Sequence, residues 1–210
     1  MLRAASFICL LLLLCALSVQ AEQDTSPGPI LVIGDSLSAD YGFDRAQGWV
    51  NLLEARLDER GESRGVVNAA ISGDTTRSGR ARIAAALERH EPSLVIIQLG
   101  GNDGLRGLPV EETAANLRQM IAASQAAGAR VLLVGVRMPP NYGRRFTEAF
   151  ADMYRTVAAD TGVVLVPRIL EGVAERENLM QADGIHPTAE AQPLILDNLW
   201  PAIEGLLETN

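Results

Sequence analysis

A length of 210 residues and a hydrophobic share of 48% allow one or two domains with a sizeable core, and they exclude a disordered chain. The formal net charge of −8 argues against nucleic acid or an anionic membrane surface as the main partner. All 18 basic residues are arginines, which excludes Schiff-base chemistry and the lysine of a P-loop.

The first residues have the pattern of a secretory signal peptide. Arg3 precedes an apolar segment, Ala4–Leu17, which is too short for a comfortable membrane span, and Val19-Gln20-Ala21 is a small-residue cleavage site. We therefore predict a signal peptide over residues 1–21 and one mature domain over residues 22–210, without a stable membrane anchor. This domain is expected to be periplasmic or secreted, and an uncleaved anchor is the alternative.

Apolar runs rich in Val, Ile and Leu alternate along the mature chain with longer segments of helical spacing. Continuous runs of this kind are typical of strands that are covered on both faces. In chain order the predicted strands are Ile30–Ile33, Gly65–Ala69, Leu94–Leu99, Arg130–Val136 and Val163–Pro167. Because parallel crossovers are right-handed, this alternation predicts an α/β fold with a doubly wound parallel sheet.

The segments between these runs are predicted to be amphipathic helices. Apolar residues recur at helical spacing from Trp49 to Leu57 and from Phe146 to Val157, and a last helix is expected from about Thr188 to Leu207. Trp49 and Trp200 lie on the apolar faces of such segments, so both are expected in the core.

Polar residues follow three of the predicted strands and fill one loop near the C-terminus. The first strand leads into IGDSLS at 33–38, the second into Ser72-Gly73-Asp74, and the third into Gly100–Asp103. The loop before the last helix reads DGIHP at 183–187. Ligands of doubly wound sheets bind beyond the carboxyl ends of the strands, so these residues are expected to meet at one edge of the sheet.

Ser36, His186 and Asp183 are the residue types of a catalytic triad. A serine hydroxyl is a poor nucleophile until a base removes its proton, and His186 can be that base. Asp183 can orient the imidazole and stabilise the imidazolium that forms. The alternative is that both stretches are ordinary turns, because Gly, Asp and Ser are common turn and cap residues.

Three hydrogen-bond donors are candidates for an oxyanion hole. The chain is expected to turn into a helix at Ser36, so that the N–H of Ser36 points toward developing negative charge. Gly73 offers a backbone N–H with no side chain to obstruct close approach, and Asn102 offers a side-chain NH₂. The acids beside these donors are interpreted as residues that fasten their loops: Asp35, Asp74 and Asp103.

Metal and thiol chemistry fit the sequence poorly. Both cysteines, Cys9 and Cys15, lie in the predicted signal peptide, so the mature chain has no disulfide and no cysteine nucleophile. Of the two histidines, His90 lies at a charged helix end, which leaves only His186 and carboxylates as ligands. We therefore predict no metal site and no cofactor.

Four short blocks resemble the motifs of the SGNH (GDSL) hydrolases. They are GDSLS at 34–38, Gly73 in ISGDT, Asn102 in GGND and DGIHP at 183–187, in the family's order. The resemblance implies a flavodoxin-like three-layer sandwich with a five-stranded parallel sheet of order 2-1-3-4-5, and the triad and oxyanion roles given above. One departure is Asp40, where relatives more often carry glycine.

Four residues in two loops are candidates for substrate binding. The segment Gly104–Pro109 combines two glycines with two leucines, which suggests a mobile lip over an acyl chain, with a plain loop as the alternative. Residues after the fourth strand are expected to wall an apolar pocket. The four candidates are Leu105, Leu108, Met138 and Tyr142.

These features and the resemblance predict a serine esterase that hydrolyses carboxylic esters and thioesters through an acyl-enzyme on Ser36. The resemblance implies an arylesterase, acyl-CoA thioesterase or lysophospholipase type, which acts on a small-molecule or lipid acyl ester or thioester. A monomer is expected because no strong exposed apolar patch can be read from the sequence, and the acidic charge argues against nucleic acid. The acyl group is expected to be medium to long and apolar. Two alternatives stay open, a carbohydrate or peptidoglycan O-acetylesterase on the same scaffold and a catalytically silent binding module.

Overall fold

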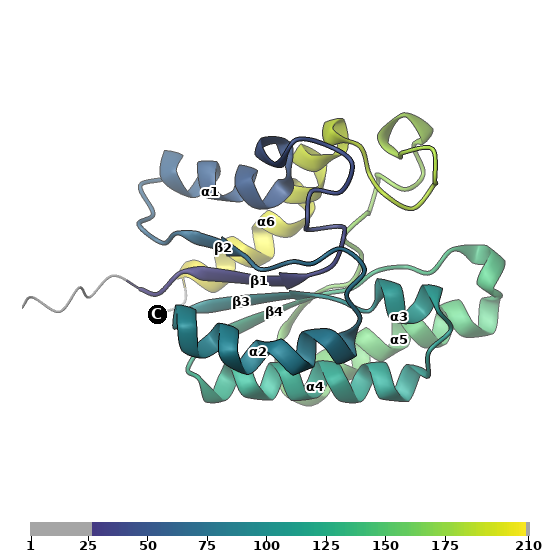
Figure 1. Cartoon of the computed structure of the whole chain (residues 1–210), viewed down its shortest axis with the longest axis horizontal. Coiled ribbons are helices and arrows are strands. Elements are labelled where there is room, and N and C mark those ends of the chain that lie inside the picture. The colour runs from purple at the N-terminus through teal and green to yellow at the C-terminus, as the bar shows by residue number, and fades with distance from the viewer. Residues whose placement is uncertain (1–26, 209–210) are drawn as a thin grey trace, which may run out of the picture.

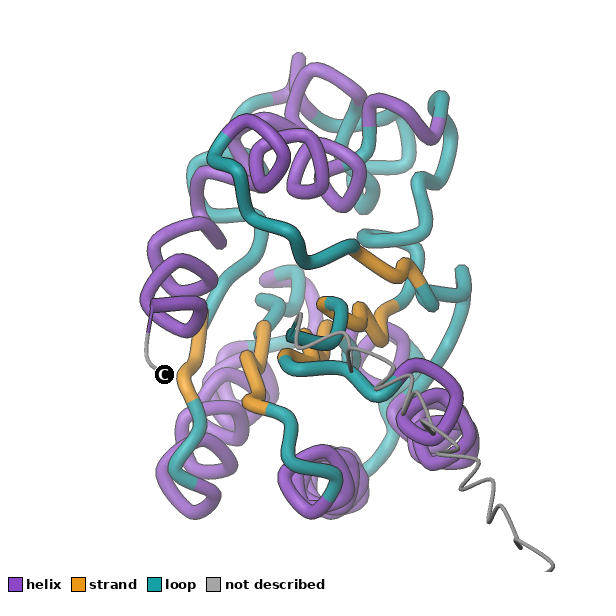
Figure 2. Tube along the Cα trace, turned by 90° about the vertical axis from the view of Figure 1, so that its left-hand side faces the viewer, coloured by secondary structure: helices purple, strands orange, loops and turns teal. Residues whose placement is uncertain are grey.

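The computed structural model describes residues 27–208, and within them a parallel sheet of five strands has the order β2-β1-β3-β4-β5. The strands are Ile30–Gly34 (β1), Val66–Asn68 (β2), Leu94–Gln98 (β3), Arg130–Val134 (β4) and Val164–Val166 (β5). Helices α1 and α6 cover one face of the sheet, and α2, α4 and α5 cover the other (Figure 1). Figure 2 shows the strands end-on between these two helical layers. The predicted doubly wound fold and strand order are confirmed.

The centre of the sheet is built from the two most apolar runs. All residues of β1 and β3 are buried, and they pair in parallel from Ile30 with Leu94 to Gly34 with Gln98. The edge strands β2 and β5 are only partly buried and are short. The predicted runs 65–69, 130–136 and 163–167 are longer than the strands because their ends fall outside the paired registers.

The helices start and stop at capping residues. Their bounds are Trp49–Glu59 (α1), Thr76–His90 (α2), Gly101–Leu105 (α3), Val110–Ala126 (α4), Arg144–Thr161 (α5) and Gln192–Glu208 (α6). Thr75 and Ser78 form a capping box before α2, and Gly162 ends α5 with φ 69°. The last helix begins at Gln192 and not at Thr188, because residues 189–191 form a 3₁₀ turn.

The two tryptophans differ in their burial. Trp49 is fully buried, as predicted, and its Nε1–H donates to the carbonyl of Leu37 at 3.1 Å. Trp200 is only partly buried, so the prediction of a core position was wrong. Its ring lies under the guanidinium groups of Arg56 and Arg60, at 5.2 and 5.1 Å from the ring centroid, where a cation can face an aromatic ring in partial contact with water.

The sheet determines where a site can form. Because all five strands run in parallel, the loops after β1, β2, β3 and β4 meet beyond one edge, with residues 168–187 arriving from β5. None of the helices in residues 27–208 is long and apolar enough to cross a membrane. The predicted signal peptide falls outside the described residues.

Candidate active site

Ser36, His186 and Asp183 lie together beyond the carboxyl end of β1. The Nε2 atom of His186 is 2.8 Å from Oγ of Ser36, and its Nδ1 atom is 2.6 Å from Oδ2 of Asp183. Both distances are those of hydrogen bonds. The three side chains therefore form a continuous hydrogen-bonded chain of hydroxyl, imidazole and carboxylate. Neither at this site nor elsewhere in residues 27–208 does a group of three or more His, Cys, Asp or Glu side chains lie so that it could hold a metal ion.

The loop around His186 fixes the carboxylate of Asp183. Its Oδ1 atom accepts hydrogen bonds from the backbone N–H groups of Ile185 at 2.9 Å and of His186 at 3.0 Å. Desolvation alone would raise the pKa of Asp183, but the hydrogen bonds from the side chain and backbone of His186 and from Ile185 lower that pKa to about 2. Asp183 is therefore ionised at neutral pH, as a carboxylate that orients an imidazole must be.

The chain after Ser36 forms turns and not a helix. The N–H groups of Ser38 and Ala39 both donate to the carbonyl of Asp35 at 3.0 Å, and the next α-helix begins only at Trp49. The expectation of a helix start at Ser36 was therefore wrong, because the tight turn is closed by local bonds. A helix dipole cannot be the reason why the Ser36 N–H faces negative charge.

A buried polar network supports this turn from behind. Asp35 is only 2% exposed, and its Oδ1 atom accepts the N–H of Leu37 and the Nε2–H of Gln98, both at 3.1 Å. The Oε1 atom of Gln98 in turn accepts the hydroxyl of Ser38 at 2.6 Å. Burial raises the pKa of Asp35 to about 6. The sequence predicted the bond within the turn, but not the burial or the link to β3.

The loops that carry Gly73 and Asn102 are tied to each other. Nδ2 of Asn102, in the first turn of α3, donates to the carbonyl of Asp74 at 3.0 Å and lies 3.5 Å from Oδ2 of Asp35. Gly73 has φ +84°, a left-handed conformation that favours glycine. Among the described groups, neither the N–H of Gly73 nor that of Ser36 has a backbone or side-chain acceptor.

The remaining acids fasten loops, as predicted. Asp74 accepts Nε of Arg82 at 2.8 Å, which holds the loop of Gly73 against α2. Asp103 accepts the N–H and hydroxyl of Thr76, at 2.9 and 2.5 Å, which joins α3 to the start of α2. Neither carboxylate is left to act as a second catalytic acid.

A cavity of about 410 Å³ opens beside Ser36, with Asn102 and His186 also in its lining. Of the four residues predicted to bind substrate, Leu105 and Met138 line this cavity. Most of the rest of its wall is apolar: Leu37, Val136, Pro139, Pro140, Ile169, Leu170, Ala174, Met180 and Ile185. The part of the wall from residues 169–174 was not predicted, and its position just after the fifth strand is the only signal that could have indicated it.

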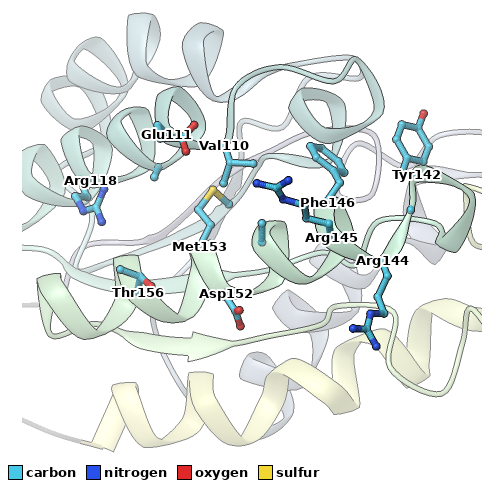
Figure 3. A pocket seen from close by; sticks show the side chains of 13 residues that line it. Val110, Glu111, Arg118, Tyr142, Arg144, Arg145, Phe146, Asp152, Met153 and Thr156 are labelled. Atoms are coloured by element: carbon cyan, nitrogen blue, oxygen red, sulfur yellow. The ribbon is translucent and has the colours of Figure 1, made fainter.

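A second hollow, of about 840 Å³, lies between α4 and α5 (Figure 3). Tyr142 lines this hollow and not the cavity of Ser36, and its hydroxyl donates to the carbonyl of Leu105 at 2.9 Å. Leu108 lines neither space. Tyr142 ends the 3₁₀ turn Pro140–Tyr142 and lies with Gly143–Phe146 in the lining of the second hollow, so both predicted binding positions were wrong. The second hollow contains no serine and no histidine.

Comparison with known proteins gives consistent results. The sequence matches the GDSL-like lipase/acylhydrolase family over residues 32–193. It is 50% identical to the esterase TesA of Pseudomonas aeruginosa over 198 residues, which cover 94% of this chain and 98% of that protein. It is 45% identical to thioesterase 1/protease 1/lysophospholipase L1 of Escherichia coli over 178 residues, which cover 85% of this chain and 84% of that protein.

A solved structure extends this likeness to the fold. The crystal structure of a psychrotrophic esterase, EstA from a Pseudoalteromonas species, inhibited by monoethylphosphonate, superimposes with a TM-score of 0.83. The two sequences are 40% identical, and the match covers 87% of this chain and all of that one. The order of the strands and the cavity at their carboxyl ends therefore occur in a fold already known to carry an esterase.

Proposed function

Because the chain belongs to the GDSL-like lipase/acylhydrolase family, we propose that Ser36, His186 and Asp183 are its catalytic triad. The protein is a hydrolase of ester bonds, of the carboxylesterase and thioesterase kind. The observation that carries the residue assignment is the pair of contacts on His186, with Ser36 at 2.8 Å and Asp183 at 2.6 Å.

In the first half of the reaction, Oγ of Ser36 attacks the carbonyl carbon of the ester or thioester. Nε2 of His186 takes the hydroxyl proton as the new C–O bond forms, and Asp183 stabilises the resulting imidazolium. The tetrahedral intermediate collapses when the bond to the leaving oxygen or sulfur breaks. His186 then donates its proton to that alcohol or thiol, and the acyl group stays on Ser36 as an ester.

In the second half, water replaces the leaving group and follows the same route. His186 takes a proton from the water, the hydroxide adds to the acyl carbon, and Ser36 regains its proton when the acid departs. We propose that the oxyanion of both tetrahedral intermediates accepts hydrogen bonds from the N–H groups of Ser36 and Gly73 and from Nδ2 of Asn102. The free N–H groups and the position of Asn102 in the cavity lining support this assignment.

The cavity indicates the chemical class of the acyl group. Its walls are mostly apolar, and Leu105, Met138 and Ile169 stand beside the nucleophile. An acyl chain of medium or greater length would bury its apolar surface there. We therefore propose lipid-like and aryl esters and thioesters as substrates. The inhibition of the related EstA by monoethylphosphonate supports a separate part of the proposal, the nucleophilic serine.

We further propose that residues 1–21 are a cleaved signal peptide and that residues 22–210 act as a periplasmic or secreted monomer. The apolar segment Ala4–Leu17 and the small-residue site at Val19–Ala21 support this proposal. Amino-terminal sequencing of the exported protein should begin at Glu22. A single peak of monomer mass in gel filtration with light scattering would agree with it, and a dimer peak would not.

Hydrolysis of p-nitrophenyl esters from acetyl to palmitoyl tests the proposed function, with the mature chain and its Ser36→Ala variant side by side. We expect hydrolysis by the wild type alone and a preference for the longer chains. Activity confined to the acetyl ester would move the substrate to the O-acetyl groups of carbohydrates. Equal activity of Ser36→Ala would overturn the triad, and inactivity of both proteins would favour a binding module.

A further inference from the structure

The aromatic ring of Tyr41 lies against the imidazole of His186. The two ring centroids are 4.3 Å apart and the ring planes meet at 36°. Tyr41 is 47% exposed, which is unusual for a large aromatic side chain, and it is not part of the lining of the cavity beside Ser36. We propose that Tyr41 is a positioning residue for His186 and that Gln181 holds it there. This inference rests on the proposed role of His186 as the base.

A face contact restrains a motion that the two hydrogen bonds of His186 leave free. Hydrogen bonds at the two ring nitrogens act along the plane of an imidazole, so the bonds to Ser36 and Asp183 resist rotation within that plane but leave the ring free to rock out of it. The loop of residues 182–185 is exposed and supplies little packing around the ring. Contact with the ring of Tyr41 limits the rocking and keeps Nε2 directed at the hydroxyl of Ser36.

Gln181 ties the loop of Tyr41 to the loop of His186. Its Nε2 group donates to the carbonyl of Tyr41 at 2.8 Å and to the carbonyl of Pro187 at 2.9 Å. Its backbone N–H donates to the carbonyl of His186 at 2.8 Å. Gln181 therefore connects the turn after the nucleophile, 140 positions away in the sequence, with the backbone carbonyls of His186 and Pro187.

The backbone on both sides of Tyr41 is shaped for this contact. Asp40 has φ +56° and Gly42 has φ +86°, so Tyr41 stands between two left-handed residues. A non-glycine residue keeps such a conformation only where its surroundings hold it. A Cβ atom on Gly42 would lie 2.5 Å from Oε1 of Gln181, so the absence of a side chain there lets the Gln181 amide reach the carbonyl of Tyr41.

The contact also suits the charge that His186 gains during catalysis. An aromatic face attracts a cation close to it, so the Tyr41 ring can interact with the imidazolium that forms when His186 takes the proton of Ser36. The charged groups that face the same imidazole are Asp183, which is hydrogen-bonded to it, and the more distant Asp35. The hydroxyl of Tyr41 has no hydrogen bond among the described residues, so the ring and not the hydroxyl carries the effect.

Four variants test this proposal: Tyr41→Phe, Tyr41→Ala, Gln181→Met and the control Gln125→Met. Gln125 also donates from Nε2 to a backbone carbonyl, that of Thr161, but at the end of α4 and away from the site. Steady-state hydrolysis of p-nitrophenyl butyrate gives kcat and KM. The rate of phosphonylation by a fluorophosphonate measures the reactivity of Ser36 without the binding of an acyl chain. Proton NMR follows the hydrogen on Nδ1 of His186, because a short hydrogen bond to a carboxylate shifts the signal of such a proton far downfield.

Tyr41→Ala should lower kcat about tenfold, with KM within twofold, slower phosphonylation and a broadened Nδ1 proton signal. Gln181→Met should also lower kcat and slow phosphonylation, while Tyr41→Phe and Gln125→Met should keep kcat within twofold of the wild type. Unchanged kcat in Tyr41→Ala, equal losses in Tyr41→Phe and Tyr41→Ala, or a change in KM alone would each overturn the proposal. A Ser36→Ala variant that still hydrolyses the ester would instead refute the triad itself, so the two failures are distinguishable.

Discussion

The Nε2 atom of His186 lies 2.8 Å from Oγ of Ser36, although 150 positions separate the two residues in the sequence. Ser36 follows β1 in the centre of the sheet, and His186 arrives on the loop between β5 and α6. The parallel sheet therefore brings together two loops from opposite ends of the chain. Local sequence provides only the third member, because Asp183 and His186 share one short loop.

Replacement of Asp183 by Asn should lower kcat by about 10⁴-fold, because the amide presents the wrong partner to Nδ1 of His186. The Asn oxygen can still accept the N–H groups of Ile185 and His186, so the loop should keep its shape. Steady-state kinetics and thermal unfolding followed by circular dichroism measure both effects. A loss of activity that is matched by a large fall in Tm would point to unfolding and contradict the expected role.

Replacement of Asn102 by Ala should lower kcat by about 10²- to 10³-fold with little change in KM, because one oxyanion donor is lost. Asn102→Asp has nearly the same shape but presents a negative charge to the oxyanion, and it should be at least as slow. Asn102→Asp separates the loss of the hydrogen-bond donor from the loss of packing, since the side chains of Asn and Asp fill similar space. Full activity in Asn102→Asp would show that this position does not contact the oxyanion.

Replacement of Asp35 by Asn should stabilise the fold at neutral pH. Burial raises the pKa of Asp35 from 3.8 to about 6, so the stability that its protonated form contributes is present below pH 3.8 and lost as the pH rises through 6. Asn stays neutral throughout. The free energy of unfolding of the variant should therefore exceed that of the wild type by up to about 3 kcal/mol at pH 7, and by little at pH 3.5.

Urea unfolding of the wild type and Asp35→Asn at both pH values measures this difference. Asp152→Asn is a matched control, because Asp152 is an exposed aspartate on α5 that pairs with Arg155. A difference between wild type and Asp35→Asn that stays constant from pH 3.5 to pH 7 would show that Asp35 does not titrate as the buried network requires.

Replacement of Leu170 by Trp should shorten the acyl chains that the enzyme prefers. Leu170 is partly buried and lines the cavity beside Ser36, so a larger side chain can occupy the cavity without displacing the core. We expect kcat/KM for the palmitoyl ester to fall about tenfold relative to the acetyl ester. Leu194→Trp, a partly buried leucine of α6 outside the cavity lining, is the control and should leave the ratio unchanged.

The sequence was sufficient for the fold, and the three residues that it predicted as a triad lie within hydrogen-bond distance of one another. Runs of Val, Ile and Leu between helical segments predicted the five strands, and the resemblance supplied their order. The loops with Ser36, Gly73 and Asn102 could be found because each follows a predicted strand, and the loop with His186 because it combines Asp, Gly, His and Pro just before the last predicted helix. Their meeting at one edge of the sheet follows from parallel topology alone.

Side-chain direction and packing were harder to predict. Tyr142 and Leu108 are near the predicted site in sequence, but Tyr142 lines the hollow between α4 and α5, and Leu108 lines neither space. Trp200 has the spacing of a core residue, yet Arg56 of α1 and Arg60, the residue after this helix, lie over its ring. The contact between Tyr41 and His186 depends on left-handed backbone at Asp40, which no pattern of hydrophobicity encodes.

The measurement that tests the central claim most directly is the intact mass of the mature chain and of its Ser36→Ala variant after reaction with a fluorophosphonate. If Ser36 is the activated nucleophile, the wild type should gain the mass of one adduct per chain and lose its esterase activity in proportion, while Ser36→Ala should gain none. An adduct of equal yield on Ser36→Ala, or an active wild type that never forms one, would contradict the assignment of Ser36.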